Sequence, residues 1–158
     1  MKPILTLFLV SAIAAPALAA ETKAGDLTIS DAVVRAMAPG VANTAAYLTV
    51  ANGGSKPDRL LSASCVCARS MEIHISHVMN GMAMMMPSGP VAIPAGGEAR
   101  FAPGGQHLMI LGLKAPLRDG AVQEIDLKFE HAGVVKASFE VKSRIEAAPP
   151  PMSMPMAH

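Results

Sequence analysis

Apolar and polar residues alternate along much of the chain, most regularly near its C-terminal end. Ile125, Leu127 and Phe129 are separated by charged residues, and a second alternating run follows over 135–141. The segment 131–133, His-Ala-Gly, separates the two runs and has the composition of a turn. Two such runs joined by a short turn predict a β-hairpin with one buried face, and they place His131 in solvent.

Shorter runs of the same period predict further strands in the regions 27–33, 45–52, 60–64, 71–76, 98–102 and 107–113. Turn-forming glycine, proline and asparagine residues lie between them, at 38–40, 52–54, 87–90 and 94–97. No stretch shows a sustained helical period. Short strands at this spacing indicate an all-β protein, either a sandwich or a Greek-key barrel.

The first nineteen residues have a different pattern from the rest. Lys2, an apolar run over 4–14 and the small residues Ala17 and Ala19 predict a signal peptide over 1–19, cleaved near Ala19 or Ala20. No later apolar run reaches the roughly 18 residues that a transmembrane helix needs. We therefore expect an exported protein with no membrane span. One folded domain over 20–146 would be followed by a flexible tail over 147–158, because prolines there break regular structure.

Charge narrows the range of partners. Removal of Lys2 leaves twelve of the thirteen Lys and Arg residues, which balance the twelve Asp and Glu residues. The chain has no basic run, and only 3% of its residues are aromatic. This composition disfavours a nucleic-acid partner and a polybasic membrane anchor.

Methionine is more abundant than packing requires, and much of it is clustered. The chain has 12 methionines. Six of them lie between 71 and 86, three of these in direct succession, so that they cannot all face one core from a strand. Near the C-terminus, Met152, Met154 and Met156 precede His158. Thioether and imidazole donors with few carboxylates nearby favour copper, and Cu(I) in particular.

Four of these donors form a spaced set: His74, Met85, His107 and Met109. His107 and Met109 lie two residues apart on a predicted strand, so both project from one face, while Leu108 faces the core. His74 lies on the outer face of another predicted strand, and Met85 lies between strands, where a loop could fold it over the others. A site without an anionic ligand should hold copper and release it to thiolates, whereas zinc would be expected to use cysteine, more histidine or a carboxylate.

The sequence does not decide the roles of the other soft donors. Cys65 and Cys67 could form a small disulfide, pack as two small residues, or offer thiolates to Cu(I) as auxiliary ligands. His77 and Met79 are either further auxiliary ligands or ordinary surface residues.

The spaced set resembles the signature of the periplasmic copper chaperone family PCu(A)C, written here as His74-x10-Met85-x21-His107-x-Met109. The likeness continues through most of the chain after the signal peptide, including the segments 44–48, 58–61, 71–74, 93–97 and 103–109. Val33 departs from the pattern, because many members carry tryptophan there.

The resemblance implies a cupredoxin-like Greek-key β-sandwich with a Cu(I) site at His74, Met85, His107 and Met109. It implies that the protein carries copper through the periplasm towards cytochrome c oxidase assembly. The acceptor would be an oxidase subunit or a thiol-containing copper chaperone. The C-terminal tail resembles extensions that bind a second copper, including Cu(II), with Met152, Met154, Met156 and His158 as donors.

We therefore expect a copper carrier without catalytic turnover, acting as a monomer or as a weak copper-bridged dimer. A copper buffer for copper tolerance is the first alternative, and only copper transfer separates the two. An electron-transfer cupredoxin would need a cysteine thiolate beside two histidines. A thiol oxidoreductase would work through Cys65 and Cys67, but their C-x-C spacing lacks the helix N-terminus that activates C-x-x-C enzymes.

Overall fold

The structure is a computed structural model that describes residues 21–145. The expected signal peptide over 1–19 and the tail over 147–158 lie outside these residues. The described part of the chain contains eleven strands and no helix. The strands are β1 (Thr22–Ala24), β2 (Leu27–Arg35), β3 (Asn43–Asn52), β4 (Asp58–Ser64), β5 (Ala68–Met79), β6 (Met82–Pro87), β7 (Val91–Ile93), β8 (Glu98–Phe101), β9 (Gln106–Leu113), β10 (Val122–Phe129) and β11 (Val134–Lys142).

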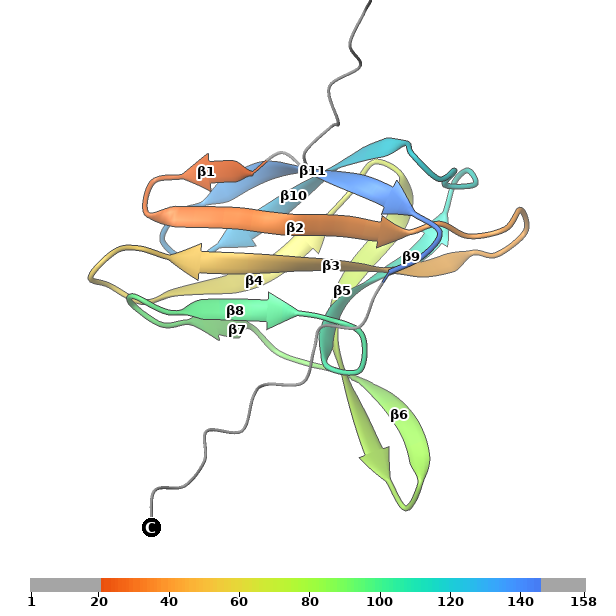
Figure 1. Ribbon diagram of the computed structural model, residues 1–158, viewed down its shortest axis with the longest axis horizontal. Coiled ribbons are helices and arrows are strands. Elements are labelled where there is room, and N and C mark those ends of the chain that lie inside the picture. The colour runs from red at the N-terminus through yellow and green to blue at the C-terminus, as the bar shows by residue number, and fades with distance from the viewer. Residues whose placement is uncertain (1–20, 146–158) are drawn as a thin grey trace, which may run out of the picture.

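The strands form one hydrogen-bonded path that folds over itself. Its order is β6-β5-β9-β3-β2-β11-β10-β4-β7, with β1 added to β2 and β8 added to β3. Strands distant in sequence become neighbours at β9–β3, β11–β2 and β10–β4, which are Greek-key connections. Figure 1 shows β2, β3 and β8 as one layer, with β4, β7 and β10 behind it.

The sandwich core lies between these layers and follows the sequence alternation. In the hairpin β10–β11, Ile125 and Leu127 are 0% exposed and Phe129 is 1% exposed, while the residues between them face outward. Leu127 pairs with Val135 across the hairpin, so the apolar residues of both strands point into the same core. The predicted hairpin is therefore confirmed.

Strand β5 is longer than the sandwich that it borders. Its first part pairs with β9 and its last part pairs with β6, through the tight turn at Asn80 and Gly81. Both turn residues have positive φ, 51° and 77°, as a two-residue hairpin loop of the Asn-Gly type requires. Residues 74–87 form the methionine hairpin, which begins where β5 still pairs with β9 and whose outer part extends away from the body of the molecule (Figure 1).

The methionine hairpin corrects one expectation. Met85 does not lie in an irregular loop but in strand β6, opposite Ser76 of β5. All six residues of β6 are exposed, so neither face of the strand is covered by other residues. For this reason the sequence of β6 shows no alternation of polar and apolar residues. The short strands β1 and β7 also fall outside the regions predicted as strands.

The connection between β4 and β5 carries a disulfide bond between Cys65 and Cys67, whose Cα atoms are 5.2 Å apart. The backbone N–H of Cys67 also donates to Sγ of Cys65 at 2.9 Å. The two cysteines lie in this turn and not on a strand. In the part of the chain that the structure describes, no helix is long and apolar enough to cross a membrane.

Candidate metal centre

Strand register places the four spaced donors on one face of the sheet. His74 of β5 lies directly opposite His107 of β9, and residues directly opposite each other share a face. Met109 follows two residues after His107 and therefore keeps that face. Met85 pairs with Ser76, which lies two residues after His74, so Met85 shares it too. Leu108 and Ile110 alternate with His107 and Met109 along β9 and are 0% exposed in the core, so the four donors lie on the outer face.

The two imidazole rings lie side by side, with centroids 6.0 Å apart. His74 donates from Nε2 to Oε2 of Glu72 at 2.9 Å, and His107 donates from Nδ1 to the carbonyl oxygen of Gly105 at 3.1 Å. A ring nitrogen that donates carries the proton, so the other nitrogen of the neutral ring has a free lone pair. Those other nitrogens, Nδ1 of His74 and Nε2 of His107, are buried and have no hydrogen-bond partner.

A buried nitrogen without a hydrogen-bond partner lowers the stability of the folded protein unless a ligand binds it. Metal-ligating histidines characteristically donate their second N–H to a carboxylate or a backbone carbonyl, as both rings do here. The residues therefore fit a soft metal ion bound between His74 and His107. The same Gly105 carbonyl also accepts from the backbone N–H of Ser76 at 3.1 Å, so one turn fixes His107 and the end of the β5–β9 pairing.

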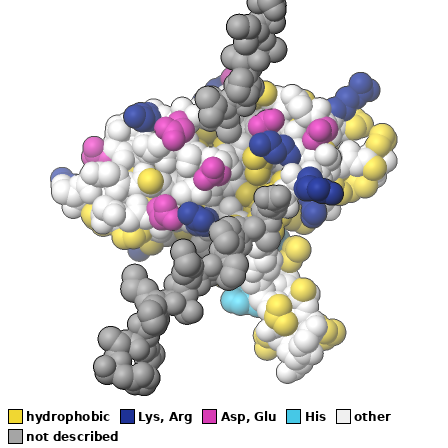
Figure 2. Space-filling view, in the orientation of Figure 1, with side chains coloured by type: hydrophobic (Ala, Val, Ile, Leu, Met, Phe, Trp, Pro, Cys, Tyr) yellow, Lys and Arg dark blue, Asp and Glu magenta, His cyan; other side chains and the backbone are white. Residues whose placement is uncertain are grey.

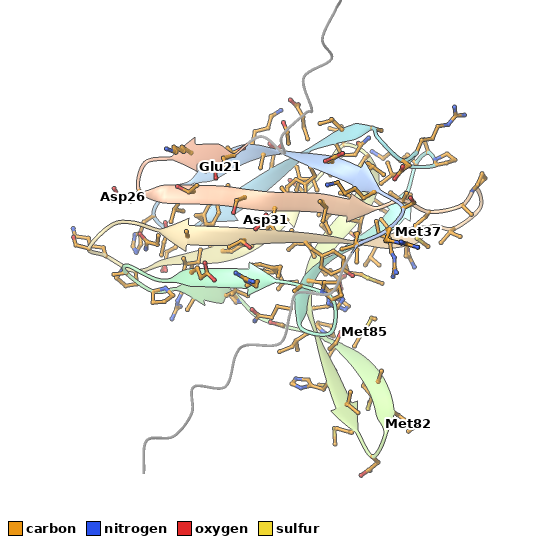
Figure 3. The ribbon with its side chains drawn as sticks, viewed as in Figure 1. Glu21, Asp26, Asp31, Met37, Met82 and Met85 are labelled. Carbon is orange, nitrogen blue, oxygen red and sulfur yellow. A yellow bond between two sulfur atoms is a disulfide. The ribbon has the colours of Figure 1, made fainter. Side chains whose placement is uncertain are left out.

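A pocket of about 390 Å³ opens on this face. Met85, His107 and Met109 line it, and His74 lies beside it, next to His107. The remaining lining includes Arg35, Met37, Thr44, Ala45, Tyr47, Ser76, Pro103 and Gly104. Figure 3 shows Met85 at the root of the methionine hairpin and Met82 farther out.

Met37 is a thioether donor that the sequence pattern did not single out. It lies just after β2, is half-buried, and lines the pocket together with Met85, His107 and Met109. Figure 3 places it near the end of β2. Because it stands alone in sequence, only the Greek-key folding of the chain brings it to the other donors.

Among the described residues, the lining of the pocket contains no carboxylate. The carboxylate of Glu72 lies on the same face, opposite Met109, and accepts from His74. Tyr47 packs beside His107 with ring centroids 6.4 Å apart. Burial raises the pKa of Tyr47, and the positive charge of Arg35 only partly counters this, so the phenol is neutral at pH 7. Among the described residues, no group of three or more His, Cys, Asp or Glu side chains is placed to hold a metal. The uncharged donors that line the pocket beside the imidazoles are thioethers, which suit a soft metal ion.

The other candidate donors lie elsewhere. His74 lies seven positions after Cys67 along largely extended chain, about 23 Å at roughly 3.3 Å per residue, so the disulfide and the pocket are apart. His77 and Met79 lie on the other face of the methionine hairpin from Met85. His131 is exposed in the β10–β11 turn. The tail donors Met152, Met154, Met156 and His158 lie outside the described residues.

Comparison with known proteins places the chain in a family. Residues 27–141 match the family described as "Putative lipoprotein LpqE-like". The chain belongs to the LpqE-like family. A relative from Leifsonia xyli subsp. xyli, "Putative lipoprotein Lxx21020", is 34% identical over 121 residues, which cover 76% of this chain and 72% of the relative.

Solved structures extend the likeness of this LpqE-like protein to PCuAC domains. The copper-bound PCuAC domain from PmoF2 is 26% identical, with a TM-score of 0.68 over 79% of this chain and 99% of that domain. Apo-DR1885 from Deinococcus radiodurans is 32% identical, with a TM-score of 0.60 over 94% of this chain and all of that one. Its Cu(I) form, CuI-DR1885, is 34% identical over 73% of this chain and 77% of that one, with a TM-score of 0.60. The expected all-β, cupredoxin-like sandwich is confirmed.

Proposed function

We propose that this LpqE-like protein is a copper carrier that binds Cu(I) through His74, Met85, His107 and Met109. One observation carries the proposal: two buried imidazole nitrogens without partners lie on the sheet face that also bears two thioethers. The copper-bound state of the PmoF2 domain and the Cu(I) state of DR1885 support the choice of metal.

The donor set suits transport better than permanent storage. Thioethers and neutral imidazoles bind Cu(I) but leave its positive charge uncompensated. An acceptor with thiolate ligands would compensate that charge and take the ion. The pocket lies on the outer face of the sheet, with Met85 61% exposed, so an acceptor can reach the metal without unfolding the sandwich.

We assign the carrier to the periplasm, without catalytic turnover, as part of cytochrome c oxidase assembly. The acceptor is then an oxidase subunit or a thiol-containing copper chaperone. The lipoprotein descriptions of the family and of the Leifsonia relative support export. A copper buffer would use the same site, and the two functions differ in transfer: a carrier loaded with Cu(I) passes it to an apo acceptor faster than free Cu(I) exchange allows.

An electron-transfer role has less support. A blue-copper site needs a cysteine thiolate, and both cysteines of this chain are joined in a disulfide away from the pocket. Oxidation of the copper-loaded protein should therefore give no intense blue absorption, and intense blue absorption from the Cu(II) form would favour electron transfer instead.

The site assignment is tested by anaerobic Cu(I) titration in competition with a Cu(I) chelator. His107→Ala and Met109→Ala should each lower the Cu(I) affinity at least tenfold and leave the β-sheet circular dichroism unchanged. His131→Ala removes a histidine outside the pocket and should bind like the parent protein. Equal affinity in all four proteins would overturn the assignment.

We further propose that the tail binds a second copper, including Cu(II), through Met152, Met154, Met156 and His158. Truncation after Ala148 should lower the copper stoichiometry and leave the affinity of the pocket unchanged. Equilibrium dialysis followed by metal analysis measures both, and equal stoichiometry before and after truncation would contradict a tail site.

A further inference from the structure

The second face of the methionine hairpin carries soft donors that the pocket does not use. Directly opposite residues share a face, and the register pairs Met79 with Met82 and His77 with Met84. Both pairs lie on the same face, because they are two residues apart along each strand. The pocket donor Met85 lies on the opposite face, paired with Ser76.

This face continues the core side of β5 past the edge of the sandwich. Ile73, on the same side of β5, is 6% exposed, but Met79, Met82 and Met84 are 58%, 66% and 44% exposed. Methionine normally fills gaps in a core, and none of the described residues covers these three. Core packing therefore does not account for them.

The methionine hairpin also carries no charged group that would compete for a metal. Residues 74–87 contain no Lys, Arg, Asp or Glu. Figure 2 shows hydrophobic side chains and a histidine on this projection, with no acidic or basic side chain on the visible side. A surface of neutral thioethers and an imidazole discriminates against hard cations and favours soft monovalent ones.

We propose that His77, Met79, Met82 and Met84 form a second binding site for Cu(I), on the opposite face of the hairpin from the pocket. Directly opposite side chains in an antiparallel pair have Cβ atoms about 4.5–5.5 Å apart, and methionine has three rotatable side-chain bonds, so the thioethers of Met79 and Met82 can meet at one ion. His77 and Met84 supply the next pair of donors along the ribbon.

The two sites are joined by consecutive residues of β6. Met84 and Met86 face the second site's side of the ribbon, and Met85 between them faces the pocket. This arrangement accounts for three methionines in succession, which one buried face could not hold. The new site does not depend on the copper-carrier function of the pocket, and the experiment below separates the two.

The test is NMR of the full mature chain, labelled with ¹³C at the methionine methyl groups and titrated anaerobically with Cu(I) alone. The methyl signals of Met79, Met82 and Met84 should shift together, in a step distinct from the one that shifts Met85 and Met109. The methionines of the tail give separate signals, so their binding does not confuse the result.

The triple variant Met79→Leu, Met82→Leu, Met84→Leu keeps apolar side chains of similar size and should lose one bound Cu(I). In that variant the Met85 and Met109 signals should still shift, and an unchanged Met71 signal would show that the sheet is intact. Val78→Leu, on the other face of the same hairpin, should bind as much Cu(I) as the parent protein.

Methyl signals of Met79, Met82 and Met84 that do not respond to Cu(I), or a triple variant that binds as much Cu(I) as the parent, would overturn the second site. Shifts of the Met79, Met82 and Met84 signals without any shift of Met85 and Met109 would support the second site and count against the proposed function of the pocket.

Discussion

At the scale of single residues, the neighbours of the two histidines matter as much as the rings. Glu72 and the Gly105 carbonyl hold the protons on one nitrogen of each ring, which leaves Nδ1 of His74 and Nε2 of His107 free to bind. Loss of such a partner typically weakens metal binding about 10–100-fold.

We therefore predict that Glu72→Ala weakens Cu(I) binding at the pocket by about tenfold. The lower end of the range applies because Glu72 is 47% exposed and water can partly replace its carboxylate. Chelator competition measures the effect. Glu98→Ala serves as the control, because it removes a carboxylate that contacts only Arg100 among the hydrogen-bonded and ion-paired side chains of the described residues. Equal losses in the two variants would argue against an orienting role for Glu72.

The sequence could predict the donors that strand periodicity places, and it could not predict Met37. His107 and Met109 share a face by their spacing alone. His74 and Met85 join them through the register of β5, β6 and β9. Periodicity does not predict that register, so only the family resemblance points to these two residues. Met37 has no periodic or spacing relation to the others and reaches the pocket only through the connection after β2.

At the scale of elements, one carboxylate fixes the turn of the β10–β11 hairpin. Asp58, at the start of β4, is 6% exposed and accepts from the backbone N–H groups of Arg59, His131 and Ala132 at 2.7, 2.9 and 3.0 Å. Burial by itself raises the pKa of Asp58, but these three hydrogen bonds and the nearby His131 lower it more, so that the net shift is downward.

Asp58→Ala should destabilise the protein by about 2–4 kcal/mol, because several backbone donors lose their partner at a buried site. A carboxyl group with a lowered pKa in the folded state contributes stability above its unfolded pKa, and that contribution is lost as the pH falls below about 4. Urea unfolding at pH 7 and at pH 3 measures both effects. The difference between the parent and the variant should shrink at pH 3, and a constant difference would contradict the pKa argument.

Strands buried on one face were predictable, and strands exposed on both faces were not. The alternation in β10 and β11 reports a sheet with one side in the core and one in water. In β6 both sides are uncovered and four of six residues are methionine, so polarity does not alternate although the backbone is extended. The sequence therefore predicts a loop over this segment, whereas the structure shows a strand paired with β5.

At the scale of the whole molecule, the disulfide and the pocket occupy separate regions, joined by the length of β5. Cys65→Ser with Cys67→Ser should therefore leave the Cu(I) affinity of the pocket unchanged. The stability loss should be small, because the closed loop is very short and constrains the unfolded chain little. Cu(I) titration and thermal unfolding test this, and a tenfold loss of affinity would mean that the turn affects the pocket after all.

The strand register that buries the core also assembles the pocket. A slip of one residue between β5 and β9 would turn Leu108 outward and send His107 and Met109 into the core, exchanging the two faces. The chain cannot pack its interior correctly and misplace these donors. On the proposed function, copper would therefore meet donors that are already in position, because the folding of the sandwich has ordered them. For the same reason, a one-residue insertion between His107 and Met109 should be far more harmful than most substitutions, because it changes the parity of the strand.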